Sequence, residues 1–204
     1  MKLNLGSGPQ IIAVAEGQEA FKNVDIRVFE GVDYVCDLSD KHWCITNNAE
    51  MPEEGENTKL NKKFKDQGCW YFKNNSIDEV FCSHFVEHLD GTERISFFNE
   101  LYRVLKPGAK ALIITPEWSH ACAYGDPTHK WPPMSSWYAL YLNKDWRTGN
   151  APHVDYTCDF DWVHGASWDE WLSVKNDEMK QFAMQHYTNS IRDLHITLSK
   201  KVTV

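Results

Sequence analysis

Residues 78–115 hold a strand, a helix and a second strand in close succession. Residues 78–82 (DEVFC) are β-rich, and in residues 92–105 apolar side chains recur at helical spacing until a Pro-Gly pair ends the segment. Residues 111–115 (ALIIT) are almost continuously apolar, which is typical of a parallel strand covered on both faces. Parallel neighbours require a long crossover such as this helix, so the stretch predicts a parallel sheet.

The remaining elements extend that sheet on both sides. Strand-like residues open the chain, and residues 23–28 (NVDIRV) and 33–36 (DYVC) are further β-rich runs. Apolar and polar residues alternate over 154–162 and again over 194–198, and residues 177–190 between them have helical periodicity. We therefore expect an α/β fold with a doubly wound, mostly parallel seven-stranded sheet, an antiparallel C-terminal strand and helices on both faces.

The domain organisation predicted from the sequence is simple. No internal repeat and no linker rich in Gly, Ser or Pro divides the chain, so residues 1–204 are expected to form a single domain. Residues 41–69 are polar and interrupt the pattern as an inserted loop, and residues 143–153 are expected to form a shorter one.

Composition excludes several classes of function. The net charge of -8 and the pI near 5.6 argue against tight nonspecific binding to nucleic acid, because no basic excess is present to displace counterions. No long apolar run suggests a signal peptide or a membrane span. The scattered cysteines form no C-x-x-C pair and are expected to be free thiols of a cytoplasmic protein; they are Cys36, Cys44, Cys69, Cys82, Cys122 and Cys158.

A glycine-rich loop, LNLGSGP at residues 3–9, follows the first strand-like residues. Gly6 and Gly8 allow a ligand to approach the main chain, but Ile11 stands where a diphosphate-binding fingerprint requires a third glycine. Asp25 follows at a distance suited to a ribose-binding carboxylate, and Asp37 lies where it can meet an adenine amino group. The pattern favours an adenosine ligand with a short anionic tail that is not a diphosphate.

In this order the motifs resemble the class I, Rossmann-like S-adenosylmethionine-dependent methyltransferases of the small bacterial and viral type. LNLGSG is similar to the first motif of the family, and SIDEVFCSHFVEHL and LYRVLKPGAKALIITPEW resemble its fourth strand, the following helix and its fifth strand. The resemblance implies S-adenosylmethionine as cofactor and methyl transfer to an unidentified small molecule, glycan or protein. It also implies cofactor contacts from Leu5, Gly6, Ser7, Gly8, Asp25, Ile26, Asp37, Leu38, Ser83 and His84.

Three residues are candidates for acid-base chemistry. His84 lies at the carboxyl end of the fourth strand, where open α/β sheets present their ligands, although it is equally suited to cap the next helix. Asp126 and His129 belong to GDPTHKW, a segment after the fifth strand that also resembles family members. Either they serve the acceptor, with His129 as the base, or they form an Asx turn braced by a histidine. Packing or capping is the favoured role of Glu87 and His88.

Further groups of residues give weaker indications of function. His120, Cys122 and His129, with Cys158 or His153, are zinc-type ligands in no compact spacing, so we expect no metal site. Residues 119–165 are expected to include an acceptor-side lid, to which the aromatic residues of 131–146 contribute. Residues 41–67 are expected to form a mobile flap beside the adenine end.

Two other classes of function are also consistent with the sequence. One is a non-catalytic module of the same fold that binds S-adenosylmethionine or a partner. The other is a nicotinamide-dependent oxidoreductase, which the missing third glycine and the expected antiparallel strand make less consistent with the sequence.

Overall fold

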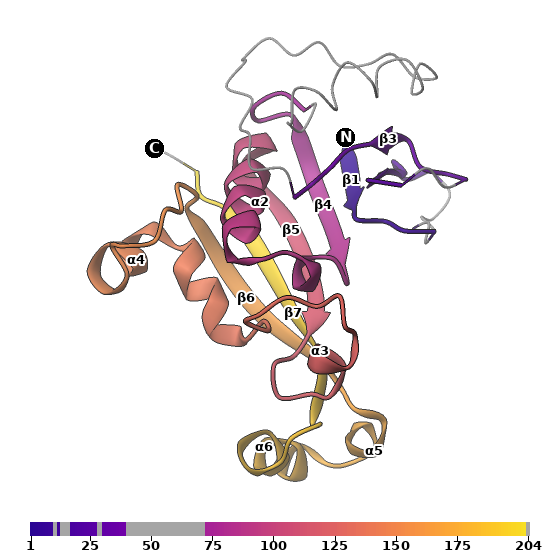
Figure 1. Cartoon of the computed structure of the whole chain (residues 1–204), viewed down its shortest axis with the longest axis vertical. Coiled ribbons are helices and arrows are strands. Elements are labelled where there is room, and N and C mark those ends of the chain that lie inside the picture. Colours follow the sequence, from indigo (N-terminus) through magenta and orange to yellow (C-terminus); the bar gives the residue numbers. More distant parts are fainter. Residues whose placement is uncertain (10–11, 13–16, 28–29, 40–71, 203–204) are drawn as a thin grey trace.

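A seven-stranded sheet in the order β3-β2-β1-β4-β5-β7-β6 forms the centre of the molecule (Figure 1). The computed structural model describes residues 1–9, 12, 17–27, 30–39 and 72–202. The strands are β1 (Lys2–Leu5), β2 (Phe21–Asp25), β3 (Tyr34–Val35), β4 (Ile77–Ser83), β5 (Leu105–Pro116), β6 (Phe160–Trp168) and β7 (Ile191–Lys200).

Strand direction confirms the expected fold class. Strands β3, β2, β1, β4 and β5 run parallel, whereas β7 pairs in the antiparallel sense with both β5 and β6. From β1 the chain moves outward through β2 and β3, and then returns to β4 on the other side of β1. Ligands of open α/β sheets bind at the carboxyl ends of strands where the order reverses, so the β1–β4 boundary positions the site.

All helices of the described residues follow β4, and they separate β4, β5, β6 and β7 along the chain. They are η1 (Val86–His88), α2 (Gly91–Val104), α3 (Cys122–Gly125), η2 (Ser136–Leu142), α4 (Lys144–Asn150), α5 (Glu170–Ser173) and α6 (Asp177–His186). A capping box starts α2: Asp90 accepts hydrogen bonds from the first turn while Glu93 accepts one from the Asp90 amide. The helix connects β4 to β5 and lies in front of β5 in Figure 1, and its residues Phe97, Phe98 and Leu101 are buried in the core.

The alternation over residues 154–162 was wrongly interpreted as a strand. Its burial is as expected, since Tyr156 and Cys158 are buried, but the backbone of residues 151–159 is irregular and β6 begins only at Phe160. The reason is Asn99 on α2, whose amide oxygen accepts hydrogen bonds from the backbone N–H groups of Thr157 and Cys158. A side chain thus satisfies the main chain where a strand partner was expected.

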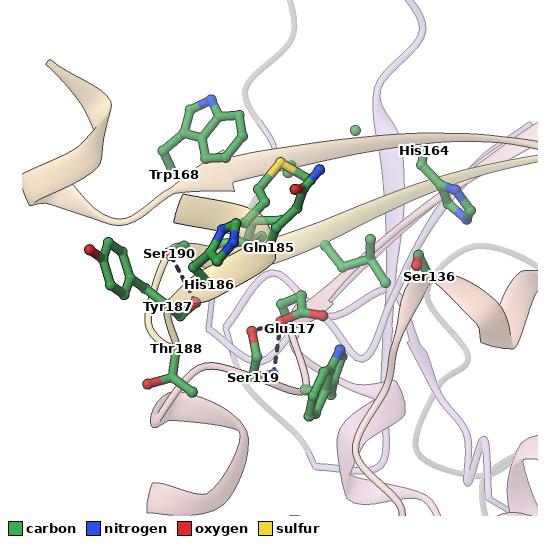
Figure 2. Close-up of a pocket in the computed structure, with 16 residues that line it drawn as sticks. Glu117, Ser119, Ser136, His164, Trp168, Gln185, His186, Tyr187, Thr188 and Ser190 are labelled. Atoms are coloured by element: carbon green, nitrogen blue, oxygen red, sulfur yellow. Dashed lines mark hydrogen bonds between the residues drawn. The ribbon is translucent and has the colours of Figure 1, made fainter. Parts of the chain in front are cut away.

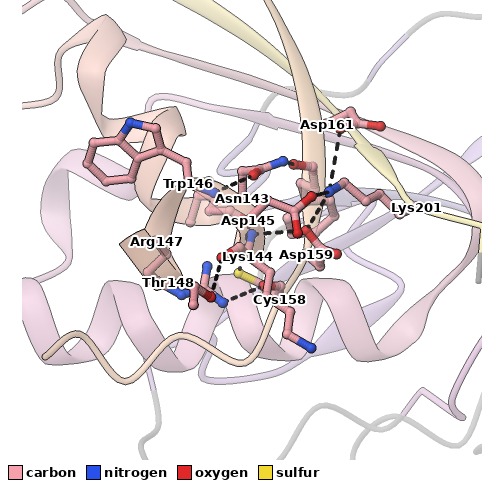
Figure 3. A network of polar contacts seen from close by, with 12 residues as sticks. Asn143, Lys144, Asp145, Trp146, Arg147, Thr148, Cys158, Asp159, Asp161 and Lys201 are labelled. Carbon is pink, nitrogen blue, oxygen red and sulfur yellow. Dashed lines mark hydrogen bonds and ion pairs between the residues drawn. The ribbon is translucent and has the colours of Figure 1, made fainter. Parts of the chain in front are cut away.

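The loop expected over residues 143–153 is also wrong, because most of it forms α4. Asn143 caps this helix by accepting a hydrogen bond from the Trp146 amide, and the buried Arg147 donates to two backbone carbonyls. Lys201 lies 3.0 Å from carboxylate oxygens of both Asp145 and Asp159, which ties α4 to the segment before β6 and to the end of β7 (Figure 3). This short polar sequence is helical because Asn143 caps its first turn and tertiary contacts of Asp145 and Arg147 stabilise it.

Several expectations can be assigned only in part. The structure does not describe the insertion predicted at residues 41–69, which includes the flap expected at 41–67. Most of residues 10–16, directly after the glycine loop, also lie outside the described residues. The described cysteines Cys36, Cys82, Cys122 and Cys158 are free thiols, as expected. Among the described helices, none combines the length and apolarity needed to cross a bilayer.

Arg94 joins α2 to the loops at the carboxyl edge. Its side chain is fully buried, and it donates through Nε to the Val86 carbonyl at 3.1 Å and through its terminal nitrogens to the carbonyls of Lys130 and Pro132. Burial lowers the pKa of this guanidinium. Three backbone carbonyls from two segments therefore share one buried cation.

Replacing Arg94 tests this role. We expect Arg94→Met to lower the free energy of unfolding by about 3 kcal/mol, because buried carbonyls lose charged donors that methionine cannot replace. The exposed Arg27 offers the control, and Arg27→Met is expected to change stability by less than about 0.5 kcal/mol. Urea denaturation of both variants measures the difference, and equal midpoints would contradict the assignment.

The glycine loop provides a second test. Gly6 and Gly8 both have positive φ, at 63° and 53°, but a Cβ on Gly6 would lie 2.5 Å from the Phe85 ring, whereas no described atom lies within 4 Å of one on Gly8. Backbone strain should cost Gly8→Ala about 1 kcal/mol, and overpacking should add about 1 to 3 kcal/mol for Gly6→Ala. Thermal denaturation of the pair checks this, and a Gly8→Ala variant that is the less stable would exclude the Phe85 contact.

Candidate active site at the carboxyl edge of the sheet

The glycine loop at the end of β1 is held by a carboxylate at the end of β2. Asp25 is buried and accepts hydrogen bonds from the backbone N–H of Gly8 at 2.8 Å and of Arg27 at 2.9 Å. The Ser7 amide donates to the Val24 carbonyl at 3.1 Å. The loop is therefore locked against β2 and its backbone is preorganised at the switch point of the sheet.

The other residues proposed to contact the cofactor differ in exposure. Leu5 and Leu38 belong to the core, and Ser7 is buried. The side chain of Ile26 is 56% exposed beside Asp25, which leaves an apolar surface open at the end of β2. Asp37 is exposed and accepts hydrogen bonds from the Ser39 amide and hydroxyl, so its side chain forms a local turn in this structure.

His84 follows β4 and is flanked by two acidic side chains. It has a positive φ of 52°, and its amide donates to the Ile114 carbonyl at 2.9 Å. Its Nδ1 lies 3.3 Å from Oε1 of Glu87, and its Nε2 lies 3.7 Å from Oδ1 of Asp193. The interaction with Glu87, followed by the charge of Asp193, raises the pKa of His84 above its ordinary value.

The position of the ring disfavours capping as the role of His84. In the described structure, Phe85 is the N-cap residue of η1 and no side chain caps this helix, and the half-exposed imidazole of His84 contacts carboxylates instead. A left-handed backbone at a residue other than glycine is strained and is frequent at functional sites. Ser83 precedes it as the last residue of β4.

Glu87 is the buried residue that joins the site together. Its Oε2 accepts a hydrogen bond from the Thr115 hydroxyl at 3.2 Å, while its Oε1 has no hydrogen-bond partner among the described residues. The rings of His88 and His129 pack with their centroids 4.8 Å apart. The sequence favoured packing or capping as the role of Glu87 and His88, and it gave no signal for Asp193. The available signal for Glu87 was a glutamate that directly follows Phe85 and Val86.

The segment with Asp126 and His129 forms an Asx turn, which was one of the two alternatives predicted from the sequence. Asp126 accepts hydrogen bonds from the Thr128 amide at 2.8 Å and the Thr128 hydroxyl at 2.7 Å, which lower the pKa of its carboxyl. Nδ1 of His129 is 3.1 Å from the Ala123 carbonyl, and the Lys130 amide donates to the Glu87 carbonyl at 2.8 Å. The turn is thus attached to η1, so His84 and His129 both border Glu87.

The zinc-type residues considered together in the sequence do not gather. Nε2 of His120 is 3.0 Å from the Asp169 carboxylate, and its Nδ1 accepts a hydrogen bond from the Cys122 amide. Cys158 is buried against the Leu142 carbonyl. A different group, Glu87, His88 and His129, brings one potential ligand atom each within 4.8 Å of one another.

A pocket of about 670 Å³ opens beyond the end of β5, between β6, β7 and α6 (Figure 2). Glu117, Trp118, Trp168 and Tyr187 are among its lining residues, and the side chain of His164 also borders it. Glu117 is buried and accepts a 2.8 Å hydrogen bond from the Ser119 amide. Glu117, which lines the pocket, lies two residues after Thr115 in the sequence, and Thr115 is the hydrogen-bond partner of Glu87. It does not include the glycine loop.

The aromatic residues proposed for a lid divide into two groups. Trp131 and Trp137 have highly exposed side chains, at 78% and 70%. Tyr138 instead packs on Phe98 and hydrogen-bonds to the hydroxyl of Tyr156, so it belongs to the core. Burial raises the pKa of Tyr138 to about 12.

Comparisons with known proteins agree with this architecture. Residues 43–113 match the family model described as a methyltransferase domain. Phosphoethanolamine N-methyltransferase 2 from Caenorhabditis elegans is 28% identical over 106 residues, which are 52% of this chain and 22% of that enzyme. The chain therefore spans about a fifth of the curated relative that it matches.

A solved structure shares the fold of this chain at low sequence identity. A S-adenosylmethionine-dependent methyltransferase from Archaeoglobus fulgidus superposes with a TM-score of 0.54 and 17% identity, covering 98% of this chain and 85% of that one. One from Methanosarcina mazei has a TM-score of 0.49 and 15% identity, covering 99% and 92%. Residues 43–113 therefore match a methyltransferase domain, and the chain as a whole shares the fold of a S-adenosylmethionine-dependent methyltransferase.

Proposed function

We propose that the protein transfers the methyl group of S-adenosylmethionine to a small acceptor at the carboxyl edge of β4 and β5. The observation that carries this proposal is the glycine loop, locked by Asp25 at the switch point and in contact with Phe85, the residue after His84. The cofactor would lie over Gly6 and Gly8, with Asp25, Ile26, Asp37 and Leu38 toward its adenosine end and Ser83 and His84 toward its sulfonium.

The acceptor is proposed to enter from the pocket beside β5. A volume of about 670 Å³ with tryptophan and tyrosine walls is in the range of sites for small molecules. This favours a small molecule over the glycan or protein acceptors that the sequence left open. The similarity to phosphoethanolamine N-methyltransferase 2 makes phosphoethanolamine the first acceptor to test.

The reaction is an in-line displacement. The acceptor's lone pair forms the new bond to the methyl carbon, the carbon–sulfur bond breaks, and sulfur keeps the electron pair as S-adenosylhomocysteine is released. We assign removal of the acceptor's proton to His84, because Glu87 and Asp193 stabilise the imidazolium that forms. His129 remains the second candidate for this proton, and Asp126 supports the turn that holds it.

Cofactor binding is the first test. We expect S-adenosylmethionine and S-adenosylhomocysteine to bind in calorimetry, and Asp25→Ala to weaken binding by about 1 to 3 kcal/mol, since both the ribose and the loop lose a charged acceptor. Asp161→Ala, an exposed carboxylate on β6, is the matched control and should bind normally. Unchanged affinity in a folded Asp25→Ala variant would reject the placement.

The base assignment is tested by single-turnover transfer once an acceptor is found. His84→Gln should lower the methyl-transfer rate by about 100-fold while cofactor affinity stays within a factor of a few, because the ring acts on the acceptor proton. The exposed His153→Gln variant serves as control. A wild-type rate in His84→Gln would transfer the role to His129.

The same experiments distinguish the alternative functions. A non-catalytic module would bind S-adenosylmethionine but release no S-adenosylhomocysteine with any acceptor. A nicotinamide-dependent oxidoreductase would bind NADH in calorimetry. The missing third glycine of the loop disfavours binding of such a dinucleotide.

A further inference from the structure

We propose that Glu87, His88 and His129 form a binding site for a divalent transition-metal ion such as Zn²⁺. The three residues come from η1 and from the turn after α3, which the hydrogen bond from the Lys130 amide to the Glu87 carbonyl holds together. One potential ligand atom of each lies within 4.8 Å of the other two. Two imidazoles and one carboxylate are a ligand set suited to Zn²⁺ or Fe²⁺, whereas Mg²⁺ and Ca²⁺ prefer oxygen ligands alone.

The hydrogen bonds of His129 leave one of its ring nitrogens free to bind an ion. Nδ1 lies 3.1 Å from the carbonyl oxygen of Ala123, which can only accept, so Nδ1 carries the proton. In the neutral ring, Nε2 therefore has an available lone pair. A backbone carbonyl that fixes the tautomer in this way is a common outer partner of metal-binding histidines.

Two successive hydrogen bonds, through Thr128 to Asp126, orient His88 and also leave its Nε2 free to bind an ion. Its Nδ1 is 3.0 Å from the Thr128 hydroxyl, and that hydroxyl donates its own proton to Asp126 at 2.7 Å. The Thr128 oxygen consequently accepts from Nδ1 of His88, and Nε2 of this ring is also left unprotonated. Asp126 thereby acts as a positioning residue for His88.

Glu87 supplies the independent observation. Its side chain is 5% exposed, and Oε1 is buried without a hydrogen-bond partner among the described residues. A buried carboxylate is costly unless a cation or a hydrogen-bond donor pairs with it, and a bound metal ion would pair with Oε1. His84, 3.3 Å from Oε1, is the competing cation, so the ion pair without a metal is the alternative that the experiment must exclude.

The geometry requires only a small adjustment. Zinc bonds of about 2.0 to 2.1 Å place tetrahedral ligand atoms roughly 3.4 Å apart. His88 and His129 are partly exposed, so their side chains are less enclosed by packing than the buried Glu87. Three protein ligands leave a coordination position for an oxygen atom of an acceptor, and only this last role rests on the proposed function.

The test measures metal binding directly, without cofactor or acceptor. The full chain, freed of any affinity tag and treated with a chelator, is titrated with Zn²⁺ in calorimetry and with Co²⁺ by visible absorbance. We expect saturable one-to-one binding of micromolar affinity or tighter. His88→Ala, His129→Ala and Glu87→Gln should each weaken it by more than about 100-fold, since loss of an outer hydrogen bond alone costs roughly 10-fold to 100-fold.

Matched variants separate ligands from bystanders. Thr128→Val removes the relay to His88 without removing a ligand, and it should weaken Zn²⁺ binding by about 10-fold to 100-fold. The exposed histidines His153 and His186 are controls, and their alanine variants should bind Zn²⁺ normally. Circular dichroism verifies that each variant is folded, and His88→Gln replaces any alanine variant that is not.

Either of two results would overturn the proposal. One is the absence of saturable Zn²⁺ and Co²⁺ binding to the wild-type chain, which would leave the His84–Glu87 ion pair as the full explanation. The other is unchanged binding in folded His88 and His129 variants. Because no S-adenosylmethionine is present, failure of metal binding and failure of methyl transfer are observed separately.

Discussion

The buried guanidinium of Arg94 is the interaction on which the edge of this molecule depends. It satisfies carbonyls of η1 and of the segment that follows the Asp126 turn, and both segments lack a strand or a long helix of their own. A buried cation needs several acceptors, so the two loops must converge on α2 for the charge to be tolerated. Their convergence brings Glu87 of η1 next to the turn that holds His129.

A second constraint connects this edge to the cofactor side. The Phe85 ring occupies the space that a side chain at position 6 would need, so the glycine loop and the residues after β4 fit together only with glycine there. Asp25 closes the other side of the loop through the Gly8 amide. The proposed methyl donor and the cluster around His84 are therefore set by adjoining strands of one sheet, β1 and β4.

Most of the sheet could be predicted from the sequence because buried parallel strands and an amphipathic helix have distinct periodicities. The strand predicted over residues 154–162 failed because the Asn99 side chain, distant in sequence, replaces a strand partner. The helix α4 was missed because its stability comes from Asn143, Arg147 and the contacts of Lys201 with Asp145. Local patterns do not contain such tertiary hydrogen bonds.

Part of the candidate site could also be predicted from the sequence. The glycine loop, Asp25 and His84 follow strands, so their common edge could be inferred from order alone. The pairing of Glu87 with His88 and His129 could not, because it depends on how a turn some forty residues later folds back onto η1. Asp126 accepts two hydrogen bonds from Thr128, as the Asx-turn alternative predicted from the sequence.

Hydrogen exchange of the full chain with and without S-adenosylhomocysteine tests the central claim most directly. If the ligand lies over the locked loop, the backbone amides of residues 6–8, 25–27 and 83–85 should gain protection, because these segments meet at the β1–β4 boundary. Protection confined to the pocket of Trp168 and Tyr187, or no protection at saturating ligand, would contradict the account.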